Sequence, residues 1–241
     1  MKEHFSEKDI FRTRDITEFY RSIKPDLKKS TINWRVYHLV KKGVLERIGR
    51  GTFKIGKKIP FVPQISSKEV SLAKIIQARY PYSDLCIWNT SIINRFMLHQ
   101  PFRFMTMVEV DKDSASSIFN YLREEGENAF LKPGREIIDN YLQQVENPVV
   151  VRPLITEAPI QEVDNINTIT IEKLLVDLFS DEVIFSAYQG NELNIIFKEV
   201  FSAYTVNEKK LLRYADRRKR KSKLIDYLEK LDLLSIGWEY E

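Results

Sequence analysis

Cysteine is nearly absent from the sequence, and this narrows the chemistry that the chain can perform. Among 241 residues there is one cysteine, Cys86. A single thiol excludes an internal disulfide and a multi-cysteine zinc site. Because Cys86 stands beside Ile87 in an apolar stretch, we expect it to be a buried small hydrophobe rather than a nucleophile. The low cysteine content also favours the reducing cytoplasm as the location.

Glycine, histidine and long apolar runs are scarce as well. The 8 glycines form no glycine-rich phosphate loop, no G-x-G-x-x-G and no Gly-x-Ser-x-Gly. The histidines, His4, His38 and His99, form no H-x-x-x-H pair. No apolar run approaches the roughly 18 residues that span a bilayer, and the N-terminus does not read as a signal peptide. We therefore expect no enzyme activity, no cofactor, no resident metal and no membrane partner.

Charge is abundant but unevenly distributed along the chain. Residues 1–60 hold 16 Lys and Arg against 7 Asp and Glu, a balance of +9. Residues 61–206 hold 12 against 20, a balance of −8, and residues 207–241 hold 10 against 7, a balance of +3. A basic block in front of an acidic body is typical of a polyanion-binding module.

Residues 30–55 carry the clearest local pattern. Apolar residues at helical spacing predict a helix with Ser30 as its N-cap and Gly43 at its end. The buried stripe of this helix would consist of Ile32, Val36, Leu39 and Val40. The opposite face would carry Ser30, Trp34, Tyr37, His38 and Lys41, with Asn33 and Lys42 on its flanks.

Two short β-like runs, 44–48 and 52–55, follow this helix and are joined by Gly49-Arg50-Gly51. Glycines in a tight turn permit positive φ and leave Arg50 at the tip. A helix followed by a ribbon with a basic tip is the layout of a winged helix-turn-helix, whose helix enters the major groove while the ribbon contacts phosphates or the minor groove. The alternative is a small helix–hairpin packing unit with a polar outer face. The basic block favours DNA binding.

The segments on either side complete the predicted domain. Residues 1–10 predict a short helix with Phe5 and Ile10 as core candidates, and Thr13 can cap a second helix that ends before Pro25. Its buried side would consist of Ile16, Phe19, Tyr20 and Ile23. Pro60-Phe61-Val62-Pro63 is typical of an extended linker. We therefore predict a winged helix-turn-helix domain at 1–59 and a second domain at 64–241.

The second domain shows alternating helical and strand patterns. Helices are predicted over 67–80, 90–99, 114–125 and 135–145, and strands over 85–88, 102–110 and 149–151. After Pro159 the pattern becomes mostly helical, near 171–179, 190–204, 208–217 and 222–234. The sequence thus predicts a mixed α+β fold, in which the winged helix-turn-helix is followed by an α/β domain with a small sheet and a helical C-terminal end.

Two further groups of residues are candidates for chemistry. One hypothesis is a second phosphate-contacting surface formed by Arg213, Arg217, Arg218, Arg220 and Lys221, and its alternative is a solvated helix junction. The other hypothesis is a metal-dependent nuclease that uses the strand-end carboxylates Asp84 and Glu109. Nucleases of the restriction-enzyme type have a lysine two residues after the second carboxylate. Here that position holds Asp111, and the neighbouring Lys112 lies on the other face of the strand.

The chain resembles the AbiEi-type antitoxins, which regulate abortive-infection, type IV toxin–antitoxin systems. The resemblance rests on W-R-V-Y-H-L-V-K-K-G-V-L-E-R-I-G-R-G-T-F at 34–53, T-I-E-K-L-L-V-D-L-F at 170–179 and L-L-R-Y-A-D-R-R at 211–218. It implies a repressor that binds inverted repeats in its own promoter, and a C-terminal domain that counters a nucleotidyltransferase toxin without a stable complex. We expect a monomer in solution. A ligand-sensing transcription factor remains an alternative.

The resemblance also implies which residues contact DNA. It assigns the reading helix to Asn33, Trp34, Arg35, Tyr37, His38 and Lys41, and the wing to Arg47, Arg50, Thr52 and Lys54. Lys29 and Ser30 at the helix start complete the candidate set. Helix geometry supports a DNA contact for all of these residues except Arg35. Arg35 lies nearer the apolar stripe and is expected to pair with an acidic neighbour.

Overall fold

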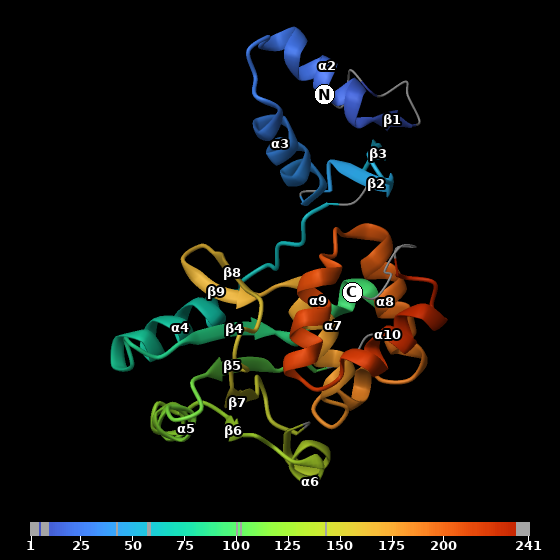
Figure 1. Cartoon of the computed structure of the whole chain (residues 1–241). Coiled ribbons are helices and arrows are strands. Elements are labelled where there is room, and N and C mark those ends of the chain that lie inside the picture. The colour runs from blue at the N-terminus through green and yellow to red at the C-terminus, as the bar shows by residue number, and fades with distance from the viewer. Residues whose placement is uncertain are drawn as a thin grey trace. The chain divides into compact units, whose positions relative to one another are not determined.

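The computed structural model describes residues 5, 10–41, 43–56, 59–99, 101, 103–142 and 144–234. It confirms the mixed α+β fold class and divides into two compact units (Figure 1). The first unit comprises residues 1–61 with 201–207, and the second comprises residues 62–200 with 208–241. In the described residues, no helix is long and apolar enough to cross a membrane.

The first unit packs helices against a small antiparallel sheet. Its elements are β1 (Phe11–Arg12), α2 (Thr13–Ile23), α3 (Lys29–Lys41), β2 (Leu45–Gly49) and β3 (Thr52–Ile55), with strand order β1-β3-β2 (Figure 1). Two helices followed by a two-stranded ribbon that pairs with a short leading strand form the winged-helix arrangement. In this arrangement α3 is the helix that precedes the ribbon.

Aromatic rings and the predicted α3 stripe form the core of this unit. The ring of Phe5 stacks on Phe11 with a centroid distance of 4.4 Å, and Phe11 lies 6.5 Å from Phe53. The prediction for the stripe is confirmed, since Ile32 and Val36 are buried while Leu39 and Val40 pack against the core. Burying one side of α3 fixes which side remains outside.

Several local expectations in the first unit are corrected. α3 already begins at Lys29, so Ser30 lies in its first turn and is not the N-cap. The N-cap of α2 is Arg12 rather than Thr13. Ile10 and Ile23 are exposed rather than buried. The short helix expected at 1–10 lies outside the described residues, apart from Phe5 and Ile10.

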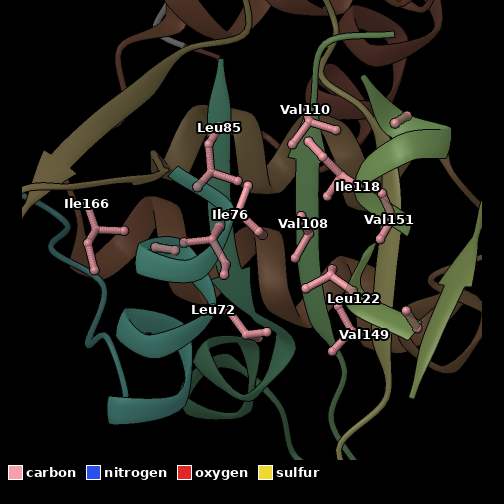
Figure 2. Packing of buried hydrophobic residues seen from close by; sticks show 14 residues of the cluster. Leu72, Ile76, Leu85, Val108, Val110, Ile118, Leu122, Val149, Val151 and Ile166 are labelled. Atoms are coloured by element: carbon pink, nitrogen blue, oxygen red, sulfur yellow. The ribbon is translucent and has the colours of Figure 1, made fainter. Parts of the chain in front are cut away.

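The second unit is built on a four-stranded sheet of order β4-β5-β7-β6. β4 (Leu85–Asn89) pairs antiparallel with β5 (Thr106–Val110), and β5 and β6 (Ala129–Leu131) both run parallel to β7 (Val149–Pro153). α4 (Ser67–Arg79) and α5 (Ala115–Glu124) pack on one face. Figure 2 shows Leu72 and Ile76 of α4 and Ile118 of α5 against sheet residues such as Val108.

The rest of the second unit consists of short helical turns, a hairpin and a set of C-terminal helices. It contains a 3₁₀ helix (Thr90–Phe96), α6 (Arg135–Ile137), a π-helical turn (Ile138–Leu142), a hairpin of β8 (Ile160–Val163) and β9 (Ile166–Ile169), α7 (Ile171–Ser180), a second 3₁₀ helix (Ser186–Tyr188), α8 (Asn191–Ala203) up to residue 200, α9 (Glu208–Arg217) and α10 (Lys221–Lys230). The predicted helix at 90–99 is therefore a 3₁₀ helix, and the predicted strand at 102–110 begins only at Thr106. The chain after Pro159 forms a hairpin before it becomes helical.

Candidate nucleic-acid interface

The outward face of α3 carries exposed aromatic rings. Trp34 and Tyr37 are 61% and 60% exposed. The Trp34 ring lies 4.1 Å from the His38 ring, and Tyr37 meets His38 edge-on at 5.5 Å. We call Trp34, Tyr37 and His38 the aromatic ridge, and Asn33 is exposed beside it. Large apolar side chains gathered on an exposed helix face mark an interaction surface.

The other helix candidates lie around this ridge. Lys29 and Ser30 are exposed in the first turn of α3, whereas the Lys41 side chain lies outside the described part. The guanidinium of Arg35 is half-buried, 5.0 Å above the ring of Tyr20 on α2. This cation–π contact replaces the acidic partner expected for Arg35 and directs its charge toward α2.

The wing candidates differ in how free their side chains are to reach DNA. Arg50 is exposed at the tip between β2 and β3. Arg47 lies 5.4 Å above the ring of Phe53, and Lys54 forms an ion pair of 3.2 Å with Glu46. Thr52 donates its hydroxyl to the Arg50 carbonyl at 3.5 Å. Arg50 is therefore the wing residue best placed to meet a phosphate.

The first turn of α2 holds the ribbon tip in place. Gly51 has a φ of +69°, and its carbonyl accepts the Thr13 N–H at 2.8 Å. Positive φ at this position suits glycine, as expected from the sequence. The anchored turn leaves the Arg50 side chain projecting from a fixed backbone.

The second unit contains a buried ion network on the sheet face opposite α4 and α5. Its members are Glu109 of β5, Arg152 of β7, Lys173 and Asp177 of α7, Asp181, and Arg218 after α9. Glu109 accepts from Lys173 at 2.6 Å, from Arg152 at 3.0 Å and from the indole N–H of Trp88 at 2.9 Å. Glu109 thus has a hydrogen bond from each of three buried donors.

Asp177 is the second centre of the ion network. Lys173 donates to it at 2.5 Å, Tyr214 at 2.8 Å, and Arg152 and Arg218 each at 2.9 Å. Asp181 closes the network through Arg152 at 2.6 Å and Arg218 at 2.5 Å. Three carboxylates and three cations therefore offset one another and join β5, β7, α7 and the end of α9.

The pKa values of these groups follow from burial and from their partners. Burial alone would raise the pKa of Asp177, but Lys173, Arg152 and Arg218 outweigh it and hold that pKa at about 2. Burial alone would lower the pKa of Lys173, yet Asp177 and Glu109 raise it above the usual value. Burial raises the pKa of Cys86 and keeps its thiol protonated, in agreement with the expected buried hydrophobe.

The positions of the strand-end carboxylates disfavour the nuclease hypothesis. Glu109 is bound by two cations inside the ion network. Asp111 accepts the Asp84 backbone N–H at 2.8 Å and the Ser83 hydroxyl at 3.1 Å. Within the described residues, no group of three or more His, Cys, Asp and Glu could hold a metal ion. The carboxylates of Glu109 and Asp111 are thus used for internal contacts.

The hypothesis of a second basic surface is corrected in part. Arg218 belongs to the ion network, with a side chain only 11% exposed, so it does not contribute to an outer surface. Arg217 forms an ion pair with Glu157. Arg213 and Lys221 are exposed, and Arg220 is half-buried. The charge of the cluster is therefore divided between the interior and the surface.

The sequence pattern does not predict the ion network. Lys173 and Asp177 come from the motif at 170–179, and Tyr214 and Arg218 come from the motif at 211–218. The only local signal was a Lys and an Asp four residues apart within an otherwise apolar helix. The two C-terminal motifs that carried the resemblance therefore meet in space.

Comparison with known families gives two matches along the chain. Residues 31–233 match the model described as "Family of unknown function (DUF6577)". The chain belongs to the DUF6577 family. Residues 1–53 match the model described as "Transcriptional regulator, AbiEi antitoxin". Among curated proteins, none matches the chain.

The two matches overlap on the candidate interface. The DUF6577 match takes in α3 from Thr31, the ribbon and the ion network, while the AbiEi match ends at Phe53 within β3. The first unit is thus similar to AbiEi regulators, and this supports the resemblance recognised from the sequence. The match supports a regulatory, antitoxin-like role for this member of the DUF6577 family.

The acid stability of this DUF6577 protein should depend on Asp177. Because its pKa falls from 3.8 to about 2 on folding, the stabilisation is present above 3.8 and is lost as the pH falls toward 2. We expect the stability difference between wild type and Asp177→Asn to shrink over this range, measured by urea unfolding at a series of pH values. Asp226→Asn, at an exposed position of α10, should show little difference at any pH. A difference for Asp177→Asn that does not change with pH would contradict the assignment.

Proposed function

We propose that the chain is a DNA-binding autorepressor and the antitoxin of a type IV, abortive-infection toxin–antitoxin system. The observation that carries the proposal is the outward face of α3, where Trp34 and Tyr37 are exposed beside Asn33. A winged module places this helix in the major groove and its ribbon at the backbone or minor groove. The match of residues 1–53 to AbiEi regulators supports the same role.

In this proposal residues 1–59 are the DNA-binding domain and residues 64–241 are a non-enzymatic effector domain. The first binds inverted repeats in its own promoter. The second counters a nucleotidyltransferase toxin without forming a stable complex, as part of cytoplasmic phage defence. The buried charges of the second unit bind one another, which suits a structural role better than catalysis. The monomer would be the form in solution.

The DNA-binding half is tested with the full chain and the duplex upstream of its own gene. Fluorescence anisotropy should show tighter binding to this duplex than to a shuffled duplex of equal length and composition. The affinity for both should fall steeply with salt, because phosphate contacts release counterions. Equal affinity for the two duplexes at every salt concentration would refute sequence-specific repression.

The wing is expected to contribute charge rather than sequence reading. Arg50→Ala should weaken binding to the promoter and shuffled duplexes by a similar factor, roughly tenfold, and reduce the salt slope by about 1. Arg14→Ala is the matched control, since Arg14 is an exposed arginine of the same unit that pairs with Glu18 on α2. An unchanged affinity and salt slope for Arg50→Ala would remove the wing from the interface.

The antitoxin half is tested by co-expression with a nucleotidyltransferase encoded directly downstream. We expect the full chain to restore growth, and Arg50→Ala to restore it equally when both genes are placed under foreign promoters. No complex should survive size-exclusion chromatography. Failure to restore growth, or a co-eluting complex, would contradict the type IV mechanism while leaving DNA binding intact.

A ligand-sensing transcription factor is the second candidate, and a groove in the second unit favours it. The groove has a volume of about 1240 Å³ and is lined by residues that include Gln64, Asn89, Arg103, Glu146 and Asp164. Ordinary small-molecule sites range over roughly 300–1,000 Å³, so the groove has room for a ligand of that class. A small molecule that released the promoter duplex without any toxin present would favour this function.

A further inference from the structure

The chemistry of the α3 face indicates which base pairs it would read. We infer that α3 recognises an A·T-rich half-site, with Asn33 bound to adenine and the rings of Trp34 and Tyr37 against thymine methyl groups. The inference rests on the proposed DNA-binding function and deepens it by naming the bases.

Spacing brings these three side chains to one surface. Residues three and four apart are neighbours on a helix, so Tyr37 adjoins both Asn33 and Trp34. In the major groove only thymine presents a methyl group, and an asparagine amide fits the N6 and N7 edge of adenine. One amide beside two neighbouring apolar rings therefore complements adjacent A·T pairs better than G·C pairs.

The usual guanine reader is directed away from this surface. Arginine bound to O6 and N7 is the commonest specific contact with guanine. The sequence of α3 contains one arginine, Arg35. Its guanidinium lies 5.0 Å above the Tyr20 ring and is therefore directed toward α2. The outward face thus lacks an arginine aimed at bases.

The lysine at the start of α3, Lys29, is exposed and suits a phosphate backbone. Lys29 and Lys41 are the first and last residues of the helix. Twelve residues of helix correspond to about 18 Å at 1.5 Å per residue. This length exceeds the major-groove width of about 12 Å, so the first turn of α3, with the exposed Lys29, can meet a phosphate backbone while the centre of the helix reads the bases.

His38 holds the indole in place. Its ring lies 4.1 Å from that of Trp34, and His38 itself is half-buried. Contact between a flat ring and a single methyl group is favoured when the ring is already oriented before binding. The aromatic ridge is thus a preorganised apolar reader.

The test compares thymine with deoxyuridine, which lacks the methyl group. The full chain selects duplexes from a randomised library, and the enriched duplex is then made with thymine or with deoxyuridine at each position. We expect A·T-rich enrichment and about fourfold weaker binding for each contacted methyl group removed. Trp34→Ala and Tyr37→Ala should each abolish the effect at their own positions. Tyr82→Ala is the control, because Tyr82 is 99% exposed in the second unit.

The outcomes separate this inference from the proposed function. Enrichment of no duplex would refute DNA binding itself. Enriched G·C-rich sites, or equal binding of the thymine and deoxyuridine duplexes, would overturn the A·T assignment while DNA binding stands. Concentration-dependent dimers that disappear in Trp34→Ala, together with insensitivity to deoxyuridine, would assign the ridge to a second copy of the chain and also overturn the inference. Thermal melting confirms that each variant is folded.

Discussion

Replacing Lys173 with methionine is expected to lower the free energy of unfolding of the second unit by about 3–5 kcal/mol. The Lys173 side chain is fully buried and bridges Glu109 at 2.6 Å and Asp177 at 2.5 Å. Methionine fills a similar volume, so little packing is lost. What is lost is one of three cations facing three carboxylates, and a buried charge without full compensation is costly.

The single cysteine provides a local measurement of this effect. Cys86 lies buried in β4, and its raised pKa makes the native thiol unreactive. The rate at which a thiol reagent labels Cys86 then reports how often the second unit opens. Lys198→Met removes an exposed lysine of α8 and should change stability by less than about 0.5 kcal/mol. Equal labelling rates in the two variants would mean that Lys173 contributes no net stability.

The buried ion network shows which features of the second unit could be predicted from the sequence and which could not. The helix at 171–179 was predicted from the spacing of Ile171, Leu174, Leu175 and Leu178, and it is observed as Ile171–Ser180. Periodicity within one helix could not show that Lys173 points inward. Its partner Glu109 is 64 residues away in the chain, on a strand whose position depends on the sheet. Long-range partners decide whether a charged residue is buried.

Short strands were missed for a related reason. β6 has three residues, and only its pairing with β7 makes it a strand. The β8–β9 hairpin turns at Asp164 and Asn165, whose φ values are +51° and +63°. Such a turn is typical of a two-residue hairpin, but the mostly helical pattern after Pro159 hid it. The strands 85–88 and 149–151 were predictable because their apolar runs are buried on both faces.

The first unit was more readily predicted because its determinants are local. The α3 stripe, the ribbon and the exposed Arg50 all follow from residues within 30–55. The contact of Arg35 was not predictable, since its ring partner Tyr20 lies on the preceding helix. That contact bears on the inferred base preference, because it keeps a guanidinium away from the outward face of α3. The role of the aromatic ridge in DNA binding remains a prediction.

Gly56→Ala is expected to unfold the first unit and abolish DNA binding. A Cβ atom at Gly56 would lie 2.0 Å from the carbonyl oxygen of Gly43, a distance that no rotamer change can relieve. The backbone is also held there, since the Gly56 N–H donates to the Val44 carbonyl at 3.0 Å. If Gly43 and Gly56 moved apart to relieve this clash, the end of β3 would separate from the end of α3. We expect a loss of about 3 kcal/mol or more, at the upper end of the cost of overpacking.

Gly49→Ala is the matched control for this variant. The nearest atoms to a Cβ at Gly49 belong to Thr52 at 3.8 Å, an ordinary contact, so the change should cost less than about 1 kcal/mol. Circular dichroism melting and anisotropy with the promoter duplex measure stability and binding. Labelling of Cys86 should stay slow in Gly56→Ala, because the second unit has its own core. Wild-type melting and binding in Gly56→Ala would show that the close approach of Gly43 and Gly56 does not hold α3 beside the ribbon.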